Sequence, residues 1–221
     1  DAPLMLDSTE AETIEAGLKR CGGRCIVNSI NLENGELRMD EICPLLRKYG
    51  AACVALTIDE EGMAKTAEAK VQIAKRIHDL FTNKWGLDGH DLFIDPLTFT
   101  VATGMESDRR LALETLDAIE QITKELPECS ILLGVSNVSF GLKPQVRRVL
   151  NSVFLHEVIQ RGLTSAIVHA SKIIPEHQVP EDRWKAAMWL LYDRRGDDRP
   201  DGFDTDFDPL LHFLSLFEIG R

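Results

Sequence analysis

The chain has 221 residues, of which 44% are hydrophobic and 6% aromatic, a composition typical of one globular domain with a single sizeable core. Its 36 acidic and 25 basic residues give a formal net charge of -11, which argues against a surface that follows nucleic-acid phosphates. No run approaches the roughly 20 apolar residues of a membrane span, and the first residues do not resemble a signal peptide, so we expect a cytoplasmic protein without a membrane partner.

Five cysteines are spread along the chain: Cys21, Cys25, Cys43, Cys53 and Cys129. They include no Cys-x-x-Cys pair, and Cys25 and Cys53 lie inside apolar runs. Because free cysteine prefers protein cores, the pattern predicts buried, reduced thiols. Cys21 and Cys25 have no second pair of Cys or His to complete a zinc site, so we expect no metal.

Six short apolar runs recur, at residues 4–6, 25–27, 53–56, 92–94, 131–133 and 166–168. Each is followed by polar residues and then by a segment with helical periodicity. Continuous apolar strands that alternate with amphipathic helices indicate a parallel sheet with right-handed crossovers.

The segments between the runs carry start and stop signals in chain order. Thr9 and Glu12 have the spacing of a capping box at the first helix. Pro44 falls inside the second helical pattern, where it predicts a kink or a new helical start. Residues 59–62 are expected to form a polar loop, and Pro127 is expected to end the fourth helix.

A doubly wound sheet and a (β/α)8 barrel both fit this alternation. Polar residues follow every apolar run rather than gather at one switch point, which favours a barrel whose mouth is built from all the strand ends. Six units do not close eight strands. We therefore expect an α/β fold, a (β/α)8 TIM barrel that lacks its first two βα units in this chain.

The chain changes character near its C-terminus, where residues 196–208 include six Asp and residues 209–217 form an apolar helical pattern. We divide the chain into a barrel over residues 1–195 and an acidic connector with a short helix over residues 196–221, leading towards a neighbouring module. The short helix either packs on the outside of the barrel domain or docks the next module.

The polar residues after the runs are mainly carboxylates and amides: Asp7, Asn28, Asn31, Asp59, Asp95, Ser136, Asn137 and His169. A zinc ligand set, a Gly-x-Ser-x-Gly elbow and a P-loop are all missing from the sequence. Asp and Asn at strand ends suit a flat heterocycle with N–H donors and carbonyl acceptors. Structural alternatives stay open, because Asp7 and Asp95 can cap turns, Asn28 can bond loop backbone, and His169 can be a satisfied core histidine.

Five stretches carry a specific resemblance. They are Leu-Asp-Ser at 6–8, Asn-Ser-Ile-Asn at 28–31, Leu-Thr-Ile-Asp-Glu-Glu-Gly at 56–62, Asp-Pro-Leu-Thr-Phe at 95–99 and Gly-Val-Ser-Asn-Val-Ser-Phe-Gly at 134–141. In order and spacing they resemble the pterin-binding (folate) domain of cobalamin-dependent methionine synthase, over residues 4 to about 195.

The resemblance implies a methyltransferase module that binds 5-methyltetrahydrofolate and transfers its N5 methyl group to cob(I)alamin. The cobalamin-binding and homocysteine-binding modules of the same enzyme would be its partners. The resemblance also implies that Asp7, Asn28 and Asp95 hold the pterin ring, that Asn137 binds beside N5 and is catalytic, and that Arg147 contacts the p-aminobenzoyl-glutamate tail. The family's first two pterin-lining units have no match here, and His169 stands where relatives often have Asn, so no role passes to it.

Three alternatives stay open. A stand-alone methyltetrahydrofolate to corrinoid-protein methyltransferase would use the same donor, although the connector beyond the barrel favours a modular enzyme. Dihydropteroate synthase shares the fold, but its Lys near the seventh strand and Arg-x-His in the eighth are not found in this sequence. A different class is a non-catalytic, incomplete fragment of the barrel, because two missing strands would leave exposed sheet edges and apolar surface.

Overall fold

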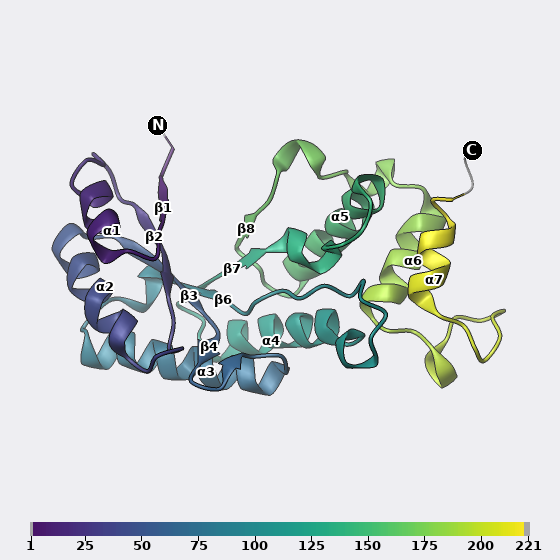
Figure 1. Ribbon diagram of the computed structural model, residues 1–221, viewed down its shortest axis with the longest axis horizontal. Coiled ribbons are helices and arrows are strands. Elements are labelled where there is room, and N and C mark those ends of the chain that lie inside the picture. The colour runs from purple at the N-terminus through teal and green to yellow at the C-terminus, as the bar shows by residue number, and fades with distance from the viewer. Residues whose placement is uncertain (1, 219–221) are drawn as a thin grey trace. The chain divides into compact units, whose positions relative to one another are not determined.

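A computed structural model describes residues 2–218, and the described part contains one six-stranded sheet and one hairpin (Figure 1). The sheet has the order β1-β2-β3-β6-β7-β8, formed by Met5–Asp7, Ile26–Ile30, Ala52–Leu56, Leu92–Asp95, Ser130–Gly134 and Ser165–Ile167. The pairings from β1 to β7 are parallel. Spatial order follows chain order, whereas a doubly wound sheet would reverse direction within it. The prediction of an incomplete (β/α)8 barrel is confirmed.

Helices follow the strands at the predicted segments. They are α1 (Ala11–Leu18), α2 (Leu37–Tyr49), α3 (Ala67–Asp79), α4 (Leu111–Glu125), α5 (Pro144–Gln160), α6 (Glu181–Leu191) and α7 (Pro209–Ser215). Short helical turns occupy Leu80–Lys84, Gly89–Asp91, Glu106–Asp108, Val135–Ser139, Ala170–Lys172, Glu176–Gln178 and Gly196–Asp198. The helices bury apolar stripes, such as Met39, Ile42 and Leu46 of α2, against the sheet residues.

Contacts between residues divide the chain into two compact units. The first comprises Asp1–Leu97, Ala118–Leu133 and Gly162–Ser165; the second comprises Thr98–Asp117, Gly134–Arg161 and Ala166–Arg221. In the first unit α1 and α2 lie beside each other and against β1 and β2 (Figure 1). In the second, α6 contacts both α5 and α7. The boundary at residue 195 stays a prediction.

One local prediction is wrong and two are refined. Thr9 and Glu12 form no capping box, because α1 begins after Glu10 without a side-chain cap, and the Ser8 hydroxyl accepts the Glu10 N–H at 3.1 Å. Pro44 starts no new helix, since α2 continues from Leu37 through it. The loop at residues 59–62 is a hairpin of β4 (Ile58–Asp59) and β5 (Gly62–Met63), made possible by the positive φ of 107° at Gly62.

The predicted burial of the cysteines is confirmed for four of the five. Cys25, Cys43, Cys53 and Cys129 are buried, Cys21 is half-buried, and all five are free thiols. Burial raises the pKa of Cys43 and of Cys129 to about 12, so both stay protonated at neutral pH. Within residues 2–218, every helix is too short or too polar to cross a membrane.

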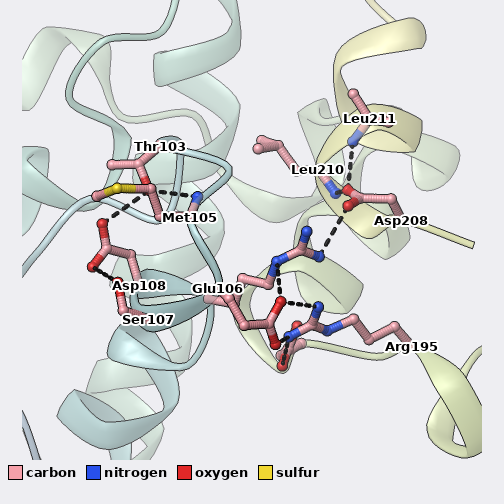
Figure 2. A network of polar contacts seen from close by, with 11 residues as sticks. Thr103, Met105, Glu106, Ser107, Asp108, Arg195, Asp208, Leu210 and Leu211 are labelled. Atoms are coloured by element: carbon pink, nitrogen blue, oxygen red, sulfur yellow. Dashed lines mark hydrogen bonds and ion pairs between the residues drawn. The ribbon is translucent and has the colours of Figure 1, made fainter.

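Ion pairs within the second unit hold the start of the acidic connector, at Arg195 just before it, and its end, at Asp208 (Figure 2). The Arg195 guanidinium donates to both carboxylate oxygens of Glu106, at 3.0 and 2.8 Å. Arg109 donates to Asp208 Oδ2 at 2.9 Å, while Asp208 Oδ1 accepts the N–H groups of Leu210 and Leu211 at the start of α7. Helix α7 packs on α6 and buries Phe213 completely. The C-terminal helix therefore packs within this unit.

Asp208 both caps α7 and pairs with Arg109, and two variants separate these contributions. Asp208→Ala should lower the free energy of unfolding by about 1–2 kcal/mol, because it removes the helix cap and the ion pair. Asp208→Asn keeps a capping oxygen and should cost no more than about 1 kcal/mol. Chemical denaturation of the full chain measures both. Equal losses would mean that the ion pair, and not the cap, dominates.

Candidate functional site

The first unit brings two of the predicted pterin ligands into contact. Asp7, the last residue of β1, lies opposite Asn28 of β2 in the parallel register. The Asn28 amide donates to Asp7 Oδ2 at 3.3 Å. The sequence suggested that Asn28 follows the strand. In the structure Asn28 lies within β2, which extends to Ile30 with a register shift between Asn28 and Ile30.

The loops beside this pair are held by a residue that the sequence analysis missed. Arg38 of α2 donates to the backbone carbonyls of Ser8 at 2.9 Å, Thr9 at 2.7 Å and Ser29 at 3.2 Å. It thereby connects the chain after β1 to the end of β2. Asn31, by contrast, has a structural role, since its side-chain oxygen accepts the Glu33 N–H at 3.0 Å.

Asp95, the last residue of β6, is a buried carboxylate with only 9% of its surface exposed. Its Oδ1 accepts the Leu97 N–H at 2.8 Å, and its backbone carbonyl accepts the Thr57 N–H at 3.0 Å. Burial raises the pKa of Asp95 to about 6, against the opposing effects of the Leu97 N–H and of the Lys70 charge. Among the described residues, the hydrogen bond to this carboxylate is made to Oδ1, which leaves Oδ2 for a ligand.

Beneath this turn lies a second residue that the sequence analysis missed. Lys70 of α3 is completely buried, and its ammonium donates to the backbone carbonyls of Pro96 and, at 3.0 Å, of Leu97. The available signal was its position on the helix, three residues before Ile73 and seven before Ile77, both buried in the core. A lysine in an apolar stripe needs acceptors of its own.

In the second unit, Asn137 lies in the short helical turn Val135–Ser139 that directly follows β7. The residue is exposed. Its backbone carbonyl accepts the Phe140 N–H at 3.1 Å. Its side-chain amide makes no hydrogen bond to the described residues, so both its donor and its acceptor groups are free for a ligand.

Arg147 of α5 is held against the same turn. Its Nε donates to Ser139 Oγ at 3.0 Å, and a terminal nitrogen donates to the Ser136 carbonyl at 2.9 Å. Ser139 Oγ in turn donates to Asn151 Oδ1 at 2.7 Å. These partners are neutral, so the guanidinium is oriented while its positive charge stays uncompensated by them.

Arg147 borders a pocket of about 390 Å³ in the second unit, lined by Ser136, Leu142, Pro144, Arg147, Arg148, Asn151, Val168, His169, Lys172 and Ile173. None of the described residues that line it carries a carboxylate, although the chain as a whole is acidic. His169 is exposed, with its Nδ1 at 3.1 Å from Ser171 Oγ, so the alternative of a core histidine is wrong. The lining favours an anionic ligand.

The topology of the sheet places the chain in the α/β barrel class. Proteins of this class bind their ligands at the carboxyl ends of the strands. Residues 1–169 match the family described as pterin binding enzyme. The chain belongs to that family.

Two curated relatives match nearly the whole chain. It is 50% identical over 219 residues to the methionine synthase of Mycobacterium tuberculosis and 49% identical over 219 residues to that of Mycobacterium leprae. Each alignment covers 98% of this chain but only 18% of the relative. The chain therefore spans about a fifth of the length of the relatives that it matches.

A solved structure supports the fold alone. Dihydropteroate synthase from Xanthomonas albilineans, in complex with 7,8-dihydropteroate, superposes with a TM-score of 0.53 at 18% identity. The superposition covers 76% of this chain and 61% of that one.

Proposed function

We propose that the chain is the folate module of a methionine synthase, which binds 5-methyltetrahydrofolate and transfers its N5 methyl group to cob(I)alamin on a separate module. The observation that carries the proposal is Asp95, a buried strand-end carboxylate with one oxygen free for a ligand. The similarity to methionine synthases supports the modular enzyme. Its cobalamin-binding and homocysteine-binding modules are the proposed partners.

The pterin ring is proposed to bind Asp95, Asp7 and Asn28. An ionised carboxylate can accept the pyrimidine N3–H and the 2-amino group together, which a neutral side chain of the same shape cannot do. Asn28 uses an amide N–H on Asp7, so its carbonyl oxygen stays available for a donor of the ring.

Asn137 is proposed to act on the methyl transfer itself. The bond that breaks joins N5 to the methyl carbon, and its electron pair stays on nitrogen while the methyl carbon bonds to cobalt of the acceptor. N5 must carry a proton for this, because an amide-like anion is a poor leaving group. The Asn137 carbonyl oxygen would accept a hydrogen bond from that N–H as the bond breaks.

The anionic tail of folate is proposed to bind at Arg147. Arg147→Ala should weaken 5-methyltetrahydrofolate binding by about 10- to 100-fold, because a charge-assisted hydrogen bond contributes about 1.5–3 kcal/mol. The same variant should bind 5-methyltetrahydropterin, which has no p-aminobenzoyl-glutamate tail, as the wild type does. Calorimetry with the two ligands provides the comparison. A similar loss for both ligands would show that Arg147 affects the ring instead.

The function is tested by calorimetric titration of the chain with 5-methyltetrahydrofolate, followed by a transfer assay with cob(I)alamin. Binding together with transfer supports the proposal. Binding without transfer would leave a non-catalytic module that only holds folate. A chain that melts cooperatively yet binds no folate would refute the proposal.

A further inference from the structure

Lys70 is a buried charge that the proposed function does not yet use. Its side chain is 0% exposed, and an ammonium group removed from water costs several kcal/mol unless acceptors replace the water. Two acceptors are the Pro96 and Leu97 carbonyls. Both belong to the turn that directly follows Asp95, so the buried ammonium acts on the backbone of this turn.

The turn itself has an unfavourable conformation. Leu97 has a φ of 62°, in the left-handed region, which costs a residue with a side chain about 1–2 kcal/mol. In this conformation the Leu97 N–H donates to Asp95 Oδ1 at 2.8 Å. Lys70 binds the carbonyl that precedes Leu97 and the carbonyl of Leu97 itself. It therefore stabilises the backbone conformation of Leu97, which in turn orients the Asp95 carboxylate.

The charge of Lys70 also acts on Asp95. Burial raises the pKa of the Asp95 carboxyl, and the Leu97 N–H and the positive charge of Lys70 lower it. Lys70 of α3 is the charged group that affects the Asp95 carboxyl among the described residues, while Thr57, which follows β3, donates its N–H and hydroxyl to the Asp95 backbone carbonyl. Loss of the ammonium would favour the protonated carboxyl.

We propose that Lys70 is a positioning residue for Asp95: it holds the Pro96–Leu97 turn, and through that turn it aims the carboxylate at the N–H donors of a bound pterin. The proposal rests on the proposed function, because a pterin is the ligand that would use these acceptors. Lys70 acts through Asp95 and the turn, from beneath them.

The test compares Lys70→Met with Lys65→Met in the full chain. Methionine keeps a long flexible side chain without the charge, and Lys65 is an exposed lysine that controls for the change in net charge. The midpoint of the Asp95 titration, followed by carbon NMR without ligand, should rise by about one pH unit in Lys70→Met. Affinity for 5-methyltetrahydrofolate should therefore fall about tenfold at pH 5 but only about twofold at pH 7, where most of the wild-type carboxyl and half of the variant's are ionised. Lys65→Met should change neither value.

The titration distinguishes positioning from a structural role. A folded Lys70→Met chain with the wild-type midpoint overturns the proposal, whether affinity is unchanged or falls equally at every pH. If the wild type binds no folate while the Asp95 midpoint still shifts in Lys70→Met, the proposed function fails and the coupling of Lys70 to Asp95 stands.

A measurement on the wild type covers the case in which Lys70→Met does not fold. In a chain with nitrogen-labelled lysine, the Lys70 Nζ resonance should move with the titration of Asp95 and should stay constant over the same pH range in Asp95→Asn. A wild-type Nζ resonance that stays constant while Asp95 titrates would overturn the proposal.

Discussion

Asp95→Asn is expected to weaken the binding of 5-methyltetrahydrofolate by about 100-fold at pH 7.5, because two charge-assisted hydrogen bonds contribute about 3 kcal/mol together. The asparagine would also present an N–H where the ring presents its own donors. The effect should depend on pH in the wild type. Its carboxyl has a pKa of about 6, so affinity should fall about tenfold per pH unit below that value.

The same variant should make the unliganded chain more stable at neutral pH. The pKa of Asp95 is about 6 in the folded chain and 3.8 for an ordinary Asp, so between these values the native state binds more protons than the unfolded state. The free energy of unfolding should therefore fall as pH rises from about 4 to 6, by about 3 kcal/mol, and stay level above that. Asp95→Asn should abolish this fall.

Two experiments check these expectations. Calorimetric titrations from pH 5 to 8 compare the folate affinities of the wild type and Asp95→Asn. Protonation of the ligand affects both chains equally, so the ratio of the two affinities reports on Asp95. Denaturation curves from about pH 4 to 8 follow the stability across the interval in which it should change. Unchanged folate affinity in Asp95→Asn would remove Asp95 from the proposed ring site, and parallel stability profiles would contradict the raised pKa.

Asn137→Ala is expected to slow methyl transfer to cob(I)alamin by about 100-fold while the affinity for 5-methyltetrahydrofolate changes by less than about threefold. A hydrogen bond that strengthens only as the N5–methyl bond breaks contributes to the rate and not to ground-state binding. Single-turnover transfer and calorimetry measure the two quantities separately.

Gln121→Ala is the control for Asn137. Gln121 is an exposed amide of α4 and is not one of the proposed site residues. This variant should transfer methyl at the wild-type rate. Equal losses of rate and affinity in Asn137→Ala would argue for a ground-state contact with the ring instead.

The architecture was predictable from the sequence because it depends on local patterns. Runs such as residues 131–133 are apolar without alternation, as a parallel strand buried on both faces requires, and the helices between them repeat apolar residues every three or four positions. Both patterns lie within a few residues, so no knowledge of distant partners was needed. Burial of Cys53 inside its strand followed in the same way.

Local details of two helices differ from what the sequence patterns indicate or leave open. Thr9 and Glu12 have the spacing of a capping box, but the Ser8 hydroxyl takes the Glu10 N–H and the helix begins one residue later. Pro44 lacks the N–H that would bond four residues back, yet the remaining bonds and the buried stripe of α2 keep the helix continuous. Small differences in free energy decide between such local arrangements of a helix.

The sequence by itself determined the order of strands and helices, the apolar core and the family resemblance that names the proposed site residues. The tertiary structure decided the environment of those residues. Burial raises the pKa of Asp95 and the Lys70 charge opposes that rise, and the carbonyls that hold Lys70 lie 26 and 27 residues away in the sequence. Asp208 meets Arg109 across 99 residues. Hydrogen-bond partners and desolvation depend on such distant segments, whose approach no local pattern encodes.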